Sequence, residues 1–466
     1  MSNQASLGEL SNSGNTSSDC SESAVSKVDL GPFSIEIPSE WNVSDFDQHI
    51  DLVNGVNYES KHYCDKGEGR IFLTLKAVKK GGGFKKEGIK HYGGPVDEEK
   101  VLSPGDLLIA NTDLTQDGDV VGYPFQVPEF PEDQREIIPS MDLSILELTT
   151  DKFNKTFLQY LFRTDYIHSR LRSFSAGSTV LHLNTDLTEN LDLPAPPQSE
   201  QQGIASILYN IDQAINKTEE MIDQTQRVKK GLMQDLFREG YYEHDTVEGN
   251  HRWEEVPEDW DFVPLNEVAK TNPRHNKPDR EIAYIEMDAV NEDVPYPDYI
   301  GRRNPQESSG RRFEEKDTLF ARITPCTENG KICFVDGIET DLGIASTELA
   351  VLSPDQDKIL PKFLYHYSRT YKVRDYAISR MRGSTGRQRV PFSVFKNELM
   401  IPLPDKEEQK EIVDLLDDLD NRKIKLREEK EQLQRLKKGL MQDLLTGEIR
   451  TNEKVEVLDE VIEVEG

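Results

Sequence analysis

The chain has 466 residues, of which 35% are hydrophobic and 30% are charged, so it is long enough for two to four folded domains with strongly charged surfaces. Its net charge of -30 argues at first sight against nucleic-acid binding, which needs basic side chains that face phosphates. No apolar run approaches the roughly 18 residues that would span a bilayer, and four scattered cysteines exclude a disulfide scaffold. We therefore expect a cytoplasmic protein in which local basic segments make any contacts with anions.

The first half of the chain begins with a Ser-rich segment that predicts a disordered tail over residues 1–30. Residues 31–199 follow as a first domain, in which strand-like runs such as GDLLIA mix with an amphipathic helix near Phe157. A basic run from Lys76 to His91 contains Lys79, Lys80, Lys85 and Lys86, which are candidate contacts for an anionic partner. Taken alone, such a run is more often a solvated face.

Two long helices are predicted, over residues 200–240 and 405–448. In the first, apolar or small residues recur at alternating spacings of four and three from Ile204 to Leu232. The second keeps an apolar residue at every seventh position from Ile412 to Leu440. So narrow a stripe needs a helical partner, and we predict that the two helices pair in antiparallel fashion as a coiled coil. Periodicity alone would favour a generic coiled coil for oligomerisation.

The second half repeats this plan after a predicted linker over residues 241–252. A second domain covers residues 253–404, with strand-like runs KICFV and ELAVL and a helix near Phe363, and an acidic tail covers residues 449–466. Its basic residues gather at Arg302 and Arg303, at Arg311 and Arg312, and in the run from Arg369 to Arg389.

The two halves are copies of one another. Gln226–Leu236 returns as Gln434–Leu444 with one difference, an offset of 208 residues from 226 to 434. Other short matches follow in the same order, namely Pro38 and Trp41 with Pro257 and Trp260, Ala110 with Ala321, Gly177-Ser178-Thr179 with Gly383-Ser384-Thr385, and Glu200-Gln201 with Glu408-Gln409. Asp117-Gly118 and Asn329-Gly330 each predict a tight turn between two strands. The sequence thus predicts an α+β fold with two domains of mixed strands and helices, separated by the two long helices.

The chain resembles the specificity subunits of type I restriction-modification systems from about Pro38 to Glu448. The resemblance rests on IPSEW and VPEDW, LFARITPCTENGKICFV, the GST tract before a Pro-rich hinge and Glu-Gln pair, and the helix end KKGLMQDLLTGE. It implies a non-catalytic subunit in which each domain is a target-recognition domain that reads one half of a bipartite, asymmetric site in double-stranded DNA. The helices would set the spacer and recruit methyltransferase subunits, two of them expected, and motor-nuclease subunits would join outside. The first domain departs from the pattern, since Leu108–Thr115 stands where the second has Phe320–Thr327.

Two groups of site residues follow from the repeat and this resemblance. The predicted DNA-binding residues are Lys79, Lys80, Lys85, Lys86, Ser178, Thr179, Arg311, Arg312, Arg380, Arg382, Arg387 and Arg389. The predicted partner-binding residues lie in the repeated helix motif and are Lys229, Lys230, Leu232, Met233, Lys437, Lys438, Leu440 and Met441. Arginine can contact guanine edges or phosphates, and the sequence does not distinguish these roles. Surface charge that balances an acidic neighbourhood is the competing interpretation.

The sequence contains none of the motifs expected for chemistry in this chain. We expect no cofactor or metal here, and S-adenosylmethionine, ATP and Mg on the partner subunits. Lys79–Phe84 is basic and rich in glycine but lacks phosphate-loop spacing, and Cys64, Cys326, Cys333 and His62 lack zinc-site spacing. A scaffold without DNA binding and a nuclease or methyltransferase are the alternatives, and neither explains duplicated domains with near-identical helices.

Overall fold

A computed structural model describes residues 25–29, 34–131, 133–248, 255–276, 278–306, 309–384 and 386–451. Residues 1–24 of the predicted tail, 249–252 of the predicted linker and 452–466 of the acidic tail lie outside these ranges. Within the predicted tail, β1 (Val25–Asp29) pairs antiparallel with β2 (Ser34–Pro38), and within the linker β15 (Thr246–Glu248) pairs with β16 (Glu255–Pro257). Only residues 25–29 of the expected disordered tail differ from the expectation, because β2 provides a strand partner for them close by in the sequence.

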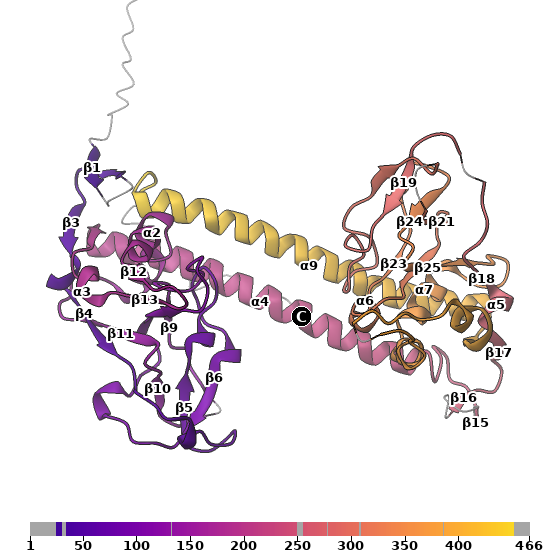
Figure 1. Ribbon diagram of the computed structural model, residues 1–466, viewed down its shortest axis with the longest axis horizontal. Coiled ribbons are helices and arrows are strands. Elements are labelled where there is room, and N and C mark those ends of the chain that lie inside the picture. Colours follow the sequence, from indigo (N-terminus) through magenta and orange to yellow (C-terminus); the bar gives the residue numbers. More distant parts are fainter. Residues whose placement is uncertain are drawn as a thin grey trace, which may run out of the picture. The chain divides into compact units, whose positions relative to one another are not determined.

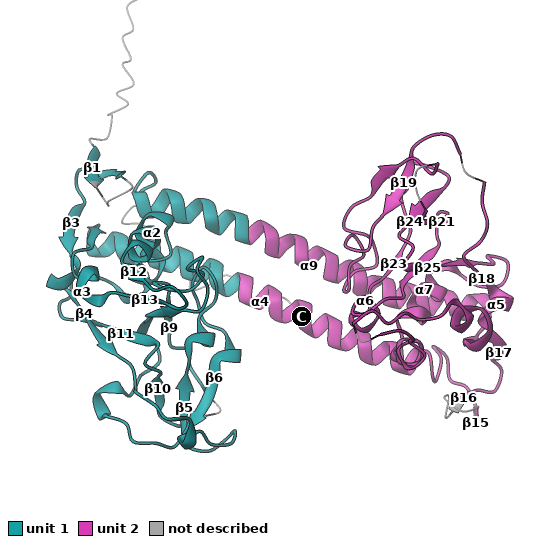
Figure 2. Cartoon of the chain, viewed as in Figure 1, with its two compact units in different colours: residues 1–214, 434–466 teal, residues 215–433 magenta. Residues whose placement is uncertain are grey.

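The chain divides into two compact units, shown in teal and magenta in Figure 2. Unit 1 comprises residues 1–214 and 434–466, and unit 2 comprises residues 215–433. Both mix short strands with helices, so the α+β class is confirmed (Figure 1). Over the described ranges, no helix is long and apolar enough to cross a membrane.

Unit 1 is built on a four-stranded sheet in the order β4-β11-β7-β9. These strands are Ile50–Asn54, Leu143–Leu148, Leu107–Ala110 and Pro124–Gln126. Smaller sheets are β10-β5-β6 (Ile137–Pro139, Arg70–Leu73, Ile89–Tyr92), β12-β13-β8 (Ser175–Ala176, Leu181–Leu183, Thr112–Asp113) and β14-β3 (Asp192–Ala195, Asn42–Asp45). The helices are α1 (Lys155–Leu161), α2 (Asp165–Ser173) and α3 (Thr185–Thr188).

Unit 2 repeats this topology with the sheet β18-β25-β22-β23. These strands are Ala269–Thr271, Leu349–Pro354, Thr318–Ala321 and Ile332–Phe334. A second sheet is β20-β19-β24-β21 (Gly301–Arg303, Ile282–Ile285, Gly343–Ala345, Arg311–Phe313), and β17 (Asp261–Pro264) pairs with β26 (Met400–Leu403). The helices are α5 (Leu265–Val268), α6 (Cys326–Asn329), α7 (Pro361–Arg369) and α8 (Tyr371–Ser379).

Strand register shows that the two units share one backbone plan. Ala110 pairs with Leu143 between β7 and β11, and Ala321 pairs with Leu349 between β22 and β25. In both units a parallel pair, β10 with β5 and β24 with β19, joins otherwise antiparallel strands. The match of Ala110 with Ala321 in the sequence therefore reflects equivalent positions on equivalent strands.

The predicted tight turn at Asn329-Gly330 is wrong. β22 and β23 are antiparallel neighbours, but the short helix α6 lies between them and ends at Asn329. Gly330 has φ 81° and ends this helix in the left-handed conformation, which glycine adopts without a steric penalty. An Asn-Gly pair can end a helix as well as form a hairpin turn, and the sequence alone does not distinguish these two structures. Asp117-Gly118 likewise lies in a longer loop between β8 and β9.

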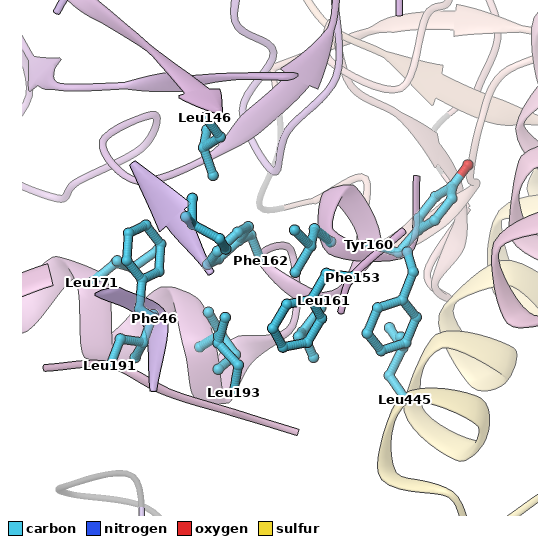
Figure 3. Packing of buried hydrophobic residues seen from close by; sticks show 14 of the residues in the cluster. Phe46, Leu146, Phe153, Tyr160, Leu161, Phe162, Leu171, Leu191, Leu193 and Leu445 are labelled. Carbon is cyan, nitrogen blue, oxygen red and sulfur yellow. The ribbon is translucent and has the colours of Figure 1, made fainter. Parts of the chain in front are cut away.

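Each unit buries a core of aromatic and aliphatic side chains. Figure 3 shows part of the core of unit 1, where Phe46, Phe153 and Phe162 lie among leucines. Leu445, which lies on the long helix α9, belongs to the same cluster. One core thus contains residues of the first strand pair, of α1 and α2, and of the C-terminal end of α9.

The two long helices are α4 (Gln198–Leu236) and α9 (Lys406–Thr446). Asp405 begins α9 by accepting a hydrogen bond from the amide of Glu408 at 2.9 Å. Within unit 2 the helices run antiparallel, since Glu219 pairs with Lys430 and Lys229 pairs with Asp420. Within unit 1 they do so as well, because Asp212 contacts Lys437 while Glu200 contacts Arg450 just beyond α9. The predicted antiparallel pairing is present in each unit.

Two ion pairs between the helices fix the register of this pairing. In unit 2, Lys229 Nζ lies 2.5 Å from Asp420 Oδ2, and the side chains are 7% and 4% exposed. In unit 1, Lys437 contacts Asp212, and the side chains are 10% and 24% exposed. The offset of 208 maps Asp212 onto Asp420 and Lys229 onto Lys437, so the two pairs are copies of each other with the roles of the helices exchanged. A shift of either helix by one residue would leave buried charges without partners.

We predict that Asp420→Asn lowers the stability of unit 2 by about 3–5 kcal/mol, because it leaves the Lys229 ammonium buried without a counter-charge. The exposed pair Lys410 with Asp414, 66% and 59% exposed, provides the control, and Asp414→Asn should cost less than about 1 kcal/mol. Urea unfolding followed by circular dichroism measures both variants. Equal effects of the two substitutions would contradict a register set by the buried pair.

Candidate functional site

A tryptophan and a Glu-Gln pair tie each domain to the helix that follows it. Trp41 Nε1 donates to Glu200 at 3.0 Å, and Trp260 Nε1 donates to Glu408 at 2.9 Å. The neighbouring Gln201 accepts from the amide of Asn154, the N-cap residue of α1, at 2.8 Å, and Gln409 accepts from the amide of Leu360, before α7, at 2.8 Å. Both glutamines also donate to a proline carbonyl of the hinge. The repeated Trp and Glu-Gln motifs are thus the contacts that orient each domain on its helix.

Beyond the end of the main sheet, three strands meet in the same way in both units. In unit 1 the amide of Asn111 donates to Asp142 O at 2.8 Å, and the amide of Leu183 donates to Asn111 O at 2.8 Å. In unit 2 the amide of Arg322 donates to Glu348 O at 3.0 Å, and the amide of Val390 donates to Arg322 O at 2.8 Å. We call this place the strand junction. It comprises Asn111, Asp142 and His182 in unit 1, and Arg322, Glu348 and Arg389 in unit 2.

The strand junction of unit 2 is an arginine cluster around one carboxylate. Arg389 donates to Glu348 through Nε and Nη2, both at 2.8 Å, and Arg322 Nη1 lies 3.7 Å from the same carboxylate. Hydrogen bonding to Arg389, together with the charges of the nearby arginines, holds the pKa of Glu348 below its usual value. Arg311 and Arg322 both lie over the ring of Phe392, with centroid distances of 4.8 and 4.1 Å. In a chain of strongly negative net charge this is a locally basic surface.

The structure brings some of the predicted arginines into this cluster and leaves others outside it. Arg311 and Arg389 belong to it, and Arg382 lies beside Arg389 because their amides and carbonyls bond reciprocally at 3.0 and 2.8 Å. Arg387 is exposed at the tip of the same loop. Arg312 follows Arg311 on β21 and therefore points to the opposite face. Arg380 ends α8 and pairs with Glu398 at 3.3 Å.

The strand junction of unit 1 carries different chemistry on the same backbone. Asn111 Nδ2 donates to Ser144 at 2.7 Å, Thr112 Oγ1 donates to Asp142 at 3.2 Å, and His182 is exposed. The predicted Ser178 and Thr179 are exposed at the tip of the β12–β13 hairpin, next to His182. Ser178 corresponds in the repeat to Ser384 of unit 2, which is also exposed.

In the first domain, hydrogen bonds to Asp113 hold a loop at the place where the second domain has the short helix α6. Its carboxylate accepts hydrogen bonds from the amides of Thr115, Val120 and Val121 and from the Thr115 hydroxyl. Burial raises the pKa of Asp113, but these hydrogen bonds outweigh burial and the pKa is lowered overall. One buried carboxylate thus folds the loop that departs from the pattern of the second domain.

The predicted lysines of unit 1 lie on a separate turn. The amides of Gly82 and Gly83 donate to Lys79 O and Pro124 O, and Arg163 Nε donates to Gly81 O, so the glycine run is already bonded within the chain. This arrangement disfavours a phosphate loop, whose amides would face the ligand. Lys80 pairs with Asp119 at 2.7 Å while 77% exposed, Lys79 and Lys86 are exposed, and Lys85 is half-buried.

Most of the predicted partner-binding residues pack inside the chain. Lys229 and Lys437 are the buried cations of the two ion pairs, and Met233 is buried in the core of unit 2 with Leu232 packed against it. Leu440 and Met441 pack against the core of unit 1. Lys229, Met233 and Lys437 are buried and Leu232, Leu440 and Met441 are half-buried, so these side chains hold the helices to the domains, and their role in partner binding stays a prediction. Lys230 and Lys438 remain exposed.

A different pair of repeated positions presents apolar surface on the helices. Val228 is 44% exposed and Leu436 is 52% exposed, and the offset of 208 relates them. Three residues after each, Gly231 and Gly439 are exposed, and a Cβ at either would meet nothing within 4 Å. A glycine inside a helix costs about 1 kcal/mol relative to alanine, and no intrachain contact of these glycines accounts for the cost.

One group of potential metal ligands occurs among the described residues. His366, Asp417 and Asp420 bring their ligand atoms within 4.8 Å of one another. Lysines already pair with both carboxylates, Lys362 with Asp417 at 2.6 Å and Lys229 with Asp420. Burial lowers the pKa of His366 to about 4, so its ring is neutral. The group is an ion-pair network. Cys333 is fully buried, and burial raises its pKa to about 12, as suits a core residue.

Comparison with known proteins places the chain in one family. The family profile described as "Type I restriction modification DNA specificity domain" matches twice, over residues 43–224 and 257–437. A putative MjaX specificity subunit of Methanocaldococcus jannaschii is 26% identical over 459 residues, which cover 92% of this chain and 97% of the relative. The MjaVIII specificity subunit of the same organism is 30% identical over 300 residues, with coverages of 60% and 68%. A crystal structure of the S subunit from M. genitalium, 12% identical, covers 87% of this chain and 96% of that chain with a TM-score of 0.55, which shows a similar fold.

We predict that Asp113→Asn loosens the loop of residues 114–121 without unfolding unit 1, because an amide oxygen replaces a carboxylate that four donors share. Hydrogen exchange of the Val120 and Val121 amides should become faster, while that of Leu108 in β7 stays unchanged. In the wild type the same loosening should appear as pH falls through the lowered pKa of Asp113, since a carboxyl with a depressed folded-state pKa stabilises above its unfolded value. Unchanged protection in the variant would remove this role from Asp113.

Proposed function

Since the chain belongs to the type I restriction-modification DNA specificity family, we propose that it reads one bipartite, asymmetric DNA site, with one half-sequence for each unit. The observation that carries this proposal is the strand junction, where one hydrogen-bonded backbone frame holds Asn111, Asp142 and His182 in unit 1 but Arg322, Glu348 and Arg389 in unit 2. A backbone frame that is kept while its side chains change suits two readers of different sequences. The arginine cluster and the exposed Arg382 and Arg387 supply the local positive charge that contact with DNA requires.

We propose further that α4 and α9 set the gap between the two half-sequences. Each helix contributes to both cores, with Ile204 of α4 and Leu445 of α9 in unit 1, and Met233 of α4 and Ile412 of α9 in unit 2. The number of helix residues between the two cores would therefore determine the distance between the two half-sequences along the DNA.

Inserting four residues after Lys217 of α4 tests the spacer role, provided that α9 is lengthened as well. An insertion in α4 alone would carry Lys229 about 6 Å past Asp420. Four residues after Glu431 of α9, opposite Lys217 in the register given by Glu219 with Lys430, keep every ion pair in place.

We expect the doubly lengthened chain, with its methyltransferase partner, to methylate both original half-sequences across a gap about two base pairs longer. Sequencing of methylated genomic DNA measures the gap, and the unmodified chain is the control. An unchanged gap, or a changed half-sequence, would remove the spacer role from the helices.

For the partner subunits we propose docking of methyltransferase subunits, two per chain, on the repeated helix motif, with motor-nuclease subunits joining outside. Gly231 lies two residues after the buried Lys229, about 200° around the helix, and so faces away from α9, as Gly439 faces away from α4. A glycine that faces outward beside an exposed Val228 or Leu436 allows the backbone of another helix to approach closely. The occurrence of this arrangement once per repeat suits two copies of the same partner.

We predict that Gly231→Leu and Gly439→Leu together weaken methyltransferase binding at least tenfold while the chain itself becomes more stable, since leucine is the better helix former by about 0.8 kcal/mol per site. Gln434→Leu, at an exposed position on another face of α9, is the matched control and should leave binding unchanged. Calorimetric titration with the methyltransferase gives the affinity, and thermal unfolding gives the stability. Undiminished affinity in the double variant would place the partner elsewhere.

The cofactors of the assembly, S-adenosylmethionine, ATP and Mg, belong in our proposal to the partner subunits. The bonded glycine run of residues 81–83 and the lysine-paired carboxylates Asp417 and Asp420 support this assignment, because each candidate site already has partners within the chain. Calorimetry on the isolated chain tests it, and stoichiometric binding of either S-adenosylmethionine or ATP would overturn it.

A further inference from the structure

We propose that Arg389 reads a guanine in the half-sequence of unit 2 and that Glu348 positions it for this task. The inference rests on the proposed function and adds the base that one side chain recognises. It starts from the position of Arg389, which is opposite Ile323 and beside Arg382 at the end of the sheet and has a side chain that is 42% exposed.

The two edges of the Arg389 guanidinium have separate roles. Nε and Nη2, which form its side edge, donate to the two carboxylate oxygens of Glu348 at 2.8 Å each. The end edge, formed by Nη1 and the second hydrogen of Nη2, keeps two parallel donors. Two parallel donors match the O6 and N7 acceptors of guanine in the major groove, which no other base presents.

Glu348 is itself held in place, which makes the arginine a rigid reader. Its carboxylate is 24% exposed, Arg322 lies 3.7 Å from it, and its backbone carbonyl accepts the amide of Arg322 at 3.0 Å. Arg322 donates to Val390 O at 2.9 Å and lies over Phe392, so the support of Glu348 has fixed partners of its own. A guanidinium fixed on one edge loses less conformational freedom when its other edge binds a base.

Arg382 and Arg387 are more exposed than Arg389. Arg387 is exposed near the tip of the loop, where its amide bonds to Ser384 O, and Arg382 is exposed beside Arg389. Side chains of this kind suit phosphates, which tolerate many approaches. In unit 1 the exposed residue at the position of Arg389 is His182, so the two half-sequences should differ at this point.

Selection from a pool of random DNA duplexes tests the assignment. The full chain with its methyltransferase partner selects duplexes from the pool, and the bound fraction is sequenced for the wild type and for Arg389→Ala, Arg389→Lys, Glu348→Gln and Arg387→Ala. We expect Arg389→Ala to reduce the preference for guanine at one position of the second half-sequence by about 5- to 150-fold, while the first half-sequence and the gap stay unchanged.

The other variants separate a base reader from a structural or phosphate-binding arginine. Arg389→Lys keeps a cation that can pair with Glu348 but loses the two-pronged edge, so it should weaken the same guanine preference even if the alanine variant fails to fold. Glu348→Gln should reduce preference at the same position by a smaller factor. Arg387→Ala, the matched control, should keep every base preference and weaken binding to all sequences, with a salt slope smaller by about one.

Three results would overturn the proposal. The first is full retention of the base preferences by Arg389→Lys and Arg389→Ala. The second is a uniform loss of affinity with a reduced salt slope in the Arg389 variants, which would mark a phosphate contact. The third is a wild-type second half-sequence without a guanine. A wild type that selects no two-part sequence is a distinguishable result and would refute the proposed function itself.

Discussion

The structure depends on two reciprocal ion pairs buried between α4 and α9. Lys229 with Asp420 in unit 2 and Lys437 with Asp212 in unit 1 have the same chemistry with the helices exchanged. A stripe of leucine, isoleucine and threonine would tolerate several registers of an antiparallel pair, because apolar contacts are not directional. Buried charges allow only one register, because any shift of the helices leaves an ammonium and a carboxylate without partners. Three of these four charged side chains are at most 10% exposed, and their burial restricts the helix pair to one register.

The domains depend on this helix pair through a second pair of repeated contacts. Trp41 with Glu200 and Trp260 with Glu408 fix the entry of each domain to the start of its helix. Gln201 and Gln409 hold the segments immediately before α1 and α7. The strand junctions follow from these anchors through the sheets β4-β11-β7-β9 and β18-β25-β22-β23. The side chains at the strand junction can then differ between the two units, because the hydrogen bonds that define the junction come from the backbone.

Sequence reasoning succeeded where the signal was periodic or repeated. The α+β class, the duplication and the helix pairing all follow from the spacing of apolar residues and from the offset between copies. It failed where a residue's role depends on partners far away in the chain. Lys229 and Lys437 have the composition of a surface motif, but an aspartate from the other helix buries each of them. Leu436 fits the apolar stripe, yet its side chain is 52% exposed.

The candidate site was predicted less completely for the same reason. Arg389 and Arg311 were identified from basic runs, but Arg322, Glu348 and Phe392 were missed, because strand register, and not spacing, brings them together. A signal for Arg322 existed in the sequence, since it follows Ala321 in the stretch that repeats Ala110 and Asn111 of the first domain. Arg311 and Arg312 were predicted together from one basic run. Side chains alternate along β21, so Arg312 points away from the cluster that contains Arg311.

The central claim is that each unit reads its own half-sequence on a shared helical frame. Exchange of residues 43–195 for the equivalent domain of a family member with a different site tests this claim most directly, with methylated DNA sequenced in the presence of the methyltransferase. Our account predicts that the first half-sequence changes to that of the donor while the second half-sequence and the gap remain. A change in both half-sequences, or in neither, from a correctly assembled complex would contradict it.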